Sequence, residues 1–138
     1  MKTTTELLHI LKSKKNYEEV MNNRPTFINS TLSGYLNELI EGKNLKKADV
    51  ISQSGFERSY AYQIFSGKKI PSRDKLIALA FGMKLTYEEV QDLLRKNGYA
   101  ILYPKNKRDN IIIFALYKGQ SILELNENLL TMNEEILV

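Results

Sequence analysis

The most constraining part of this sequence is residues 45–69, LKKADVISQSGFERSYAYQIFSGKK, which reads as two short helices separated by a tight turn at Gly55. Glycine suits that position because the turn favours a positive φ, which glycine adopts at little cost. Ala48 lies in the first helix, where we expect its small side chain to let the second helix cross closely. The pattern therefore predicts a helix-turn-helix. Five apolar side chains are available to hold its helices together: Val50, Ile51, Phe56, Ala61 and Ile64.

Apolar residues at helical spacing continue on both sides of this motif. A helix that ends at Gly42 is indicated by the apolar residues of one face: Leu32, Leu36, Leu39 and Ile40. After Pro71, Ser72 begins another helix, whose inner face we predict to be Leu76, Leu79, Ala80 and Met83. Thr86 and Glu89 form a capping box for a further helix that stops at Gly98. With the motif, these make five helices, so we predict an all-α domain over residues 30–98.

The two ends of the chain are predicted to add shorter helical parts. Residues 1–28 contain an amphipathic helix with Leu7, Leu8 and Leu11, and a second short helix at residues 16–21. We therefore expect an N-terminal helical extension.

The tail, residues 99–138, begins with an extended connector at residues 99–104. Asn106 can cap a helix that Gly119 stops, and a capping box at Ser121 opens the last one. We expect four side chains of this last helix to face the core: Ile122, Leu125, Leu129 and Met132. Residues 111–116 are apolar on every side, so a single neighbouring helix cannot cover them. The tail is thus expected to form a helical hairpin packed on the domain or on a dimer mate.

Positive charge is concentrated on the helix-turn-helix region. The net charge is +4, but residues 43–75 alone hold eight basic and three acidic side chains, and the rest of the chain holds 12 and 13. Such a basic surface is what neutralisation of phosphates requires. The alternative is that these charges only solvate helix faces, as charge runs usually do. A second basic cluster, Lys105, Lys107 and Arg108, is interpreted as a solvated loop.

Residues 32–94 resemble the DNA-binding domain of the Xre family, the lambda repressor-like (Cro/C1-type) regulators of bacteria and phages. The resemblance rests on Gly55-Phe56-Glu57-Arg58-Ser59-Tyr60, Gln63-Ile64, Ser66-Gly67-Lys68 and Pro71-Ser72. It implies the five-helix lambda repressor-like fold. It also implies a sequence-specific bacterial transcriptional regulator that reads the major groove of double-stranded DNA with the helix Glu57–Ser66. Repressors of this type commonly act as homodimers, which implies a dimer here too.

The second helix of the motif has one apolar face and one polar face at 100° per residue. Ala61 and Ile64 lie on the apolar face with Phe65, which we interpret as added core. The polar face enters the major groove in a helix-turn-helix, although in a free-standing bundle it would only face solvent. We predict four base-reading residues: Arg58, Ser59, Tyr62 and Gln63. We predict five phosphate-binding residues: Lys47, Tyr60, Lys68, Lys69 and Arg73.

Other classes of function have little support in the sequence. The chain has no cysteine and one histidine, His9, without a metal-binding partner. It shows no glycine-rich phosphate loop, nucleophile–base pair or cofactor motif. We therefore expect no enzyme, catalytic residue, metal or cofactor. No apolar run approaches the ~20 residues of a membrane helix, and no signal peptide is recognisable, which favours a cytoplasmic protein.

The alternative function is a protein-interaction adaptor. Such a protein would keep the repressor-like fold and dock a partner protein, for example through the terminal helices. Tyr60, Tyr62 and Glu57 are unusual on a DNA-reading helix and favour this alternative. The local excess of positive charge argues against it.

Overall fold

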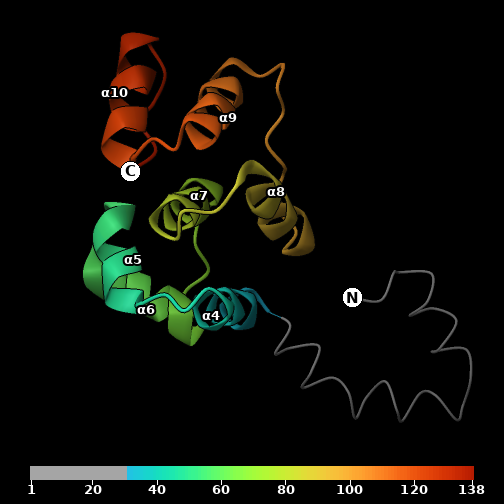
Figure 1. Cartoon of the computed structure of the whole chain (residues 1–138), viewed down its shortest axis with the longest axis vertical. Coiled ribbons are helices and arrows are strands. Elements are labelled where there is room, and N and C mark those ends of the chain that lie inside the picture. The colour runs from blue at the N-terminus through green and yellow to red at the C-terminus, as the bar shows by residue number, and fades with distance from the viewer. Residues whose placement is uncertain (1–30) are drawn as a thin grey trace, which may run out of the picture. The chain divides into compact units, whose positions relative to one another are not determined.

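Seven α-helices and no strand make up residues 31–138, the part of the chain that the computed structural model describes (Figure 1). The helices are α4 (Leu32–Gly42), α5 (Lys47–Ser54), α6 (Arg58–Ser66), α7 (Arg73–Gly82), α8 (Tyr87–Lys96), α9 (Lys107–Lys118) and α10 (Ile122–Thr131). The all-α class is confirmed for these residues. The helices expected within residues 1–28 lie outside the described part.

The helix ends follow local signals in the sequence. Each of the last four helices begins at a side chain that accepts a backbone N–H: Ser72, Asn106, and the two predicted capping boxes at Thr86 and Ser121. Such caps satisfy N–H groups that have no partner within the helix. Gly119 ends α9 in the left-handed conformation, with a φ of 64°, as predicted.

Helix α7 lies at the centre of the fold and is buried on all sides from Leu76 to Gly82. The sequence predicted a single inner face, but Ile77 and Ala78 are also fully buried. The reason is that α7 contacts helices from three directions, α5, α8 and α10. The tail hairpin, which was predicted to pack on the domain or on a dimer mate, thus covers part of α7 through α10.

Helices α5 and α7 approach one another closely at Gly82. A Cβ atom at Gly82 would collide with the Ser54 Oγ and the Val50 carbonyl oxygen. Ser54 is itself buried and donates its hydroxyl to that carbonyl at 2.6 Å. The role assigned to Ala48, to let α6 cross α5 closely, was wrong, because Ala48 is exposed.

The tail hairpin packs within the same chain. Helices α9 and α10 contact one another, α9 contacts α8, and α10 contacts α7. Its buried residues are Ile112, Ala115, Ile122, Leu125 and Leu129. Two predictions were wrong in part: Met132 is 47% exposed because α10 ends before it turns inward, and the run 111–116 keeps a solvent face at Phe114.

Side-chain amides hold two extended segments of the tail in place. Gln91 of α8 accepts the Leu102 N–H through its Oε1 at 2.8 Å and donates its Nε2 to the Leu102 carbonyl at 2.9 Å. Asn126 of α10 accepts the Leu137 N–H at 2.8 Å and donates to the Val138 carbonyl at 3.1 Å. Leu102 and Leu137 are buried as a result.

Candidate nucleic-acid interface

Helices α5 and α6 form the helix-turn-helix, with the turn at Gly55. Gly55 has a φ of 82°, the left-handed conformation that the turn was predicted to need. Val50 and Ile51 of α5 are buried, as are Ala61, Ile64 and Phe65 of α6, so Phe65 belongs to the core as predicted. Phe56 is half-buried and packs against the same cluster. On the opposite face of α6, Tyr62 packs partly against the core, while Arg58 and Ser59 are exposed.

The first turn of α6 is capped by the Glu57 carboxylate. This carboxylate accepts the backbone N–H of Ser59 and that of Tyr60, both at 2.9 Å. The hydrogen bond from Tyr60, followed by that from Ser59, lowers the pKa of Glu57. A negative charge here suits the positive end of the helix dipole. It also occupies N–H groups that could otherwise meet an anion.

The four predicted base-reading residues are brought together on the outer side of α6. Arg58 and Ser59 are exposed, and Tyr62 and Gln63 are half-buried. The Arg58 guanidinium carbon lies 5.6 Å from the centre of the Tyr62 ring, so the two side chains stack. The result is a polar strip with one cation, one hydroxyl, one phenol and one amide, all able to donate hydrogen bonds.

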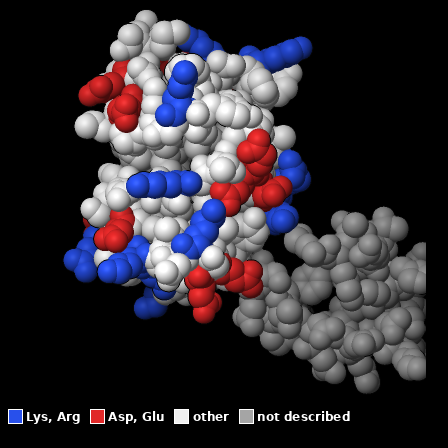
Figure 2. Space-filling model, viewed as in Figure 1, with Lys and Arg blue, Asp and Glu red and all other residues white. Residues whose placement is uncertain are grey.

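Three lysine side chains lie on α5 and in the loop after α6. The Lys47 ammonium lies 5.4 Å from the centre of the Phe65 ring, next to the second half of α6. Lys68 and Lys69 are exposed in the loop that follows α6. Figure 2 shows Lys and Arg side chains gathered at the lower left of the molecule, over α5 and α6. Among the described residues none of these three lysines forms an ion pair, so their charges are free for a ligand.

Tyr60, a predicted phosphate contact, takes part in an aromatic group inside the domain. Its ring meets the Phe56 ring edge-on, with centroids 6.2 Å apart. The Lys75 ammonium of α7 lies 4.2 Å from the centre of the Tyr60 ring. Tyr60 is half-buried. Lys75 is a candidate site residue that the sequence prediction omitted; its spacing from Tyr60 gave no local signal.

Arg73 departs from its predicted role as a phosphate contact. Its guanidinium donates to both carboxylate oxygens of Asp109 at 3.1 and 2.9 Å and to the carbonyls of Ala100 and Ile101 at 2.8 and 3.0 Å. A guanidinium with these partners has little capacity left for a phosphate. The correction follows from the tail, which brings Asp109 over the start of α7.

Arg108 also differs from its interpretation as part of a solvated loop. It is half-buried and donates to both carboxylate oxygens of Asp74 at 2.9 and 3.0 Å. The hydrogen bond to Asp74 raises the pKa of Arg108 further. Lys107 likewise reaches a backbone carbonyl, that of Met132, at 2.7 Å. Arg108 attaches the tail to α7, and Lys107 makes a hydrogen bond within the tail. Neither side chain therefore belongs to a second free basic patch.

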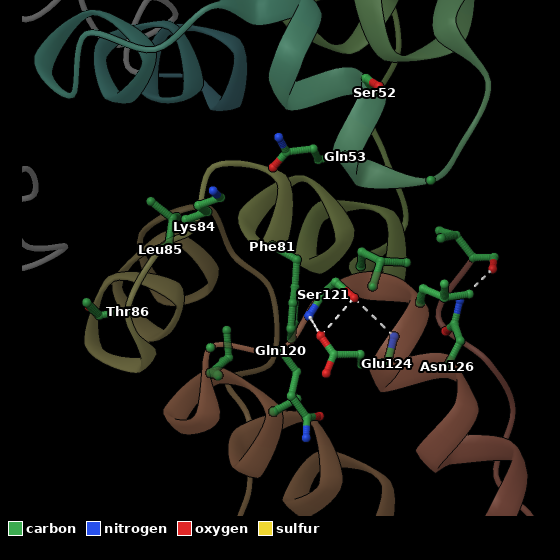
Figure 3. Close-up of a pocket in the computed structure, with 17 residues that line it drawn as sticks. Ser52, Gln53, Phe81, Lys84, Leu85, Thr86, Gln120, Ser121, Glu124 and Asn126 are labelled. Atoms are coloured by element: carbon green, nitrogen blue, oxygen red, sulfur yellow. Dashed lines mark hydrogen bonds between the residues drawn. The ribbon is translucent and has the colours of Figure 1, made fainter.

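A groove of about 860 Å³ lies beside the helix-turn-helix, on the side of the tail (Figure 3). Gln53 of α5 stands on one side, Ser121 and Glu124 of α10 stand on the other, and Phe81 of α7 lies between them. At one end the turn touches the tail: a Cβ at Gly55 would lie 3.2 Å from methyl groups of Ile122 and Val138. The tail thus supports the turn directly.

Comparison of the chain with protein-family models, with curated proteins and with solved structures gave no match. Within residues 31–138 no group of three or more His, Asp or Glu side chains is placed to hold a metal ion. No helix in that part is long and apolar enough to cross a membrane.

Proposed function

We propose that this protein is a sequence-specific DNA-binding transcriptional regulator with a lambda repressor-like domain formed by α4–α8. Helix α6 enters the major groove, and Arg58, Ser59, Tyr62 and Gln63 read base edges. Lys47, Lys68 and Lys69 pair with phosphates, with Tyr60 and Lys75 near the start of the helix. Arg73 is not among the proposed phosphate contacts, because it is paired with Asp109.

The observation that carries this proposal is the combination of an outward polar face on α6 with neighbouring cations that form no ion pair within the described residues. The core uses the apolar face of α6 and part of Tyr62, whereas Arg58 and Ser59 of the outer strip are exposed. Of the eight basic residues in 43–75, Lys43 is paired with Glu89 at 2.6 Å and Arg73 with Asp109. The other six form no ion pair within the described residues. A strip of hydrogen-bond donors within such a basic surface suits duplex DNA, which has anionic phosphates and hydrogen-bonding base edges.

The test is the binding of the full chain to random duplex DNA at about 50 and about 200 mM salt. We expect affinity to fall steeply, by about 0.9 logarithmic units per tenfold salt for each neutralised phosphate. The variant Lys47→Ala/Lys68→Ala/Lys69→Ala should bind more weakly and with a smaller salt slope. Its matched control removes the same charge elsewhere: Lys84→Ala/Lys105→Ala/Lys118→Ala should bind almost as the parent does. No binding at low salt would contradict the proposal.

Sequence specificity and dimerisation are tested by selecting binders from a random duplex library. A regulator of this kind yields a defined site. If the chain acts as a dimer, the site is a repeat of two halves about 34 Å apart and takes up two chains. A selection without enrichment would contradict the sequence-specific part of the proposal.

A second candidate function, the protein-interaction adaptor, is favoured by the tail. Phe114, Tyr117, Leu123 and Leu130 are large apolar residues of α9 and α10 that are all more than half exposed. Exposed apolar side chains of this kind are typical of surfaces that meet another protein. An adaptor would show no binding to duplex DNA in the salt titration. It would still bind a partner protein, and Leu130→Glu would abolish that binding.

A further inference from the structure

Ile70 is the large apolar side chain with the greatest exposure in the described residues, at 82%. It stands in the loop between α6 and α7, next to Lys68 and Lys69. A single exposed apolar residue is ordinary on a protein surface. What distinguishes Ile70 is the way in which the loop holds it and the charges that accompany it.

The backbone on both sides of Ile70 is fixed by hydrogen bonds. Before it, the N–H groups of Lys68 and Lys69 both donate to the Gln63 carbonyl, at 2.9 and 3.2 Å, so the loop folds back on the end of α6. After it, Pro71 is buried and its carbonyl accepts the Tyr99 hydroxyl at 2.7 Å. The loop therefore keeps its position without any packing by the Ile70 side chain. The fold presents this side chain to solvent in a defined place.

The surroundings of Ile70 match the chemistry of a nucleic-acid backbone. Lys68 and Lys69 supply two cations without ion-pair partners in the described part of the chain. A DNA strand alternates phosphate anions with deoxyribose rings, whose carbon atoms form an apolar surface. An apolar side chain beside two ammonium groups is complementary to that alternation. Burying the Ile70 side chain against a sugar would add affinity in proportion to the apolar area removed from water.

The position of the loop indicates which part of the DNA it would meet. Residues at the start of a recognition helix reach the base edges. Ile70 follows the other end of α6, where the chain leaves the groove and approaches the backbone. We propose that Ile70 packs on a deoxyribose of the DNA backbone while Lys68 and Lys69 pair with the flanking phosphates. This inference rests on the proposed DNA-binding function and assigns a further residue to it.

The experiment compares the full-length Ile70→Ser variant with the parent protein in binding to a selected duplex and to a random duplex. Both duplexes are cut to a length that holds one chain, so that contacts between two copies do not contribute. We expect Ile70→Ser to weaken binding about tenfold on both, which corresponds to losing about half of the burial of an isoleucine side chain. The salt slope should stay unchanged, because no counterion is released by an apolar contact. Lys68→Ala should instead reduce the slope by about 0.9.

Leu130→Ser is the matched control, because it removes an apolar side chain of similar exposure, 64%, from α10. It should leave DNA affinity unchanged, and both variants should unfold at the parental temperature. Equal affinity of Ile70→Ser and the parent would overturn the inference and leave the proposed function intact. A loss on the selected duplex alone would overturn it in favour of a base contact. A loss seen not on these duplexes but only on a third, longer duplex that holds two chains would overturn the inference and assign Ile70 to a contact between copies. If the parent binds no DNA at all, both proposals fall.

Discussion

Arg73 of α7 and Asp109 of α9 form a two-point ion pair, with Nη1–Oδ1 and Nη2–Oδ2 distances of 3.1 and 2.9 Å. The residues that follow and precede them, Asp74 and Arg108, form a second two-point pair in the opposite sense. The Arg-Asp dipeptides at the starts of α7 and α9 are therefore paired crosswise. They attach the tail to the central helix of the domain.

Replacement of Asp109 should destabilise the fold. Asp109 is buried, and besides Arg73 it accepts the Tyr103 N–H at 3.0 Å. We expect Asp109→Asn to lower the free energy of unfolding by about 2 kcal/mol, because it leaves a partly buried guanidinium without its counter-charge. Urea denaturation measures this. The control is Asp92→Asn, which breaks the exposed Arg95–Asp92 pair and should change stability by less than about 0.5 kcal/mol. Equal effects of the two variants would contradict the structural role of Asp109.

Substitution of Gly55 should strain the helix-turn-helix and its contact with the tail. Gly55→Val places a β-branched residue at positive φ, and we expect a loss of well over about 1 kcal/mol in stability. Comparison of Gly55→Ala with Gly98→Ala separates backbone strain at positive φ from crowding of the new Cβ. Gly55 and Gly98 have similar φ values, 82° and 80°, but a Cβ at Gly98 meets nothing within 4 Å. Thermal unfolding should show a greater loss for Gly55→Ala; identical losses would mean that the tail does not crowd the turn.

Arg58→Ala is expected to affect DNA affinity and leave stability unchanged. Arg58 is exposed and its guanidinium lies over the Tyr62 ring. As a base-reading residue it should contribute about 1–3 kcal/mol at the selected site and set the preference at one base pair. Binding to single-base variants of that site tests this. An equal loss on random duplex would make Arg58 a phosphate contact.

Glu57 should make both stability and DNA affinity depend on pH. Its folded-state pKa is lowered by the backbone hydrogen bonds from Tyr60 and Ser59. The cap therefore stabilises the fold above the unfolded-state pKa, and this contribution disappears as pH falls through the lower folded-state pKa. We expect the difference in melting temperature between the parent and Glu57→Gln to shrink over that acidic range. At neutral pH, Glu57→Gln should bind random duplex more tightly, since it removes a negative charge near the phosphates. A constant difference in melting temperature would contradict the assignment of the cap.

Most helix boundaries could be predicted because their signals are local. The capping boxes at Thr86 and Ser121 each join residues three apart, and the turn at Gly55 depends on one residue type. The polar strip on α6 followed from the 100° period for the same reason. Contacts between distant segments gave no such signal. Arg73 and Asp109 are 36 positions apart, and nothing in the spacing distinguishes Arg73 from the free lysines near it.

The errors in the core have a related cause. Ala48 satisfied the expected pattern of a small residue in the first helix, yet it is exposed, and the small residue that a close approach requires is Gly82 of α7, which packs against α5. Which small residue meets a neighbouring helix depends on how the tail and α7 dock. The periodicity of one helix does not contain that information.

The amides of Gln91 and Asn126 have a consequence for how the tail can be recognised. Each one satisfies the backbone of an extended segment as a neighbouring strand would, at Leu102 and at Leu137–Val138. A peptide that binds by adding a strand needs unpaired N–H and C=O groups along an edge. At these two places the edge is already closed from within the chain. A partner of the tail would therefore have to engage side chains on the helices, and selectivity would follow from shape more than from main-chain pairing.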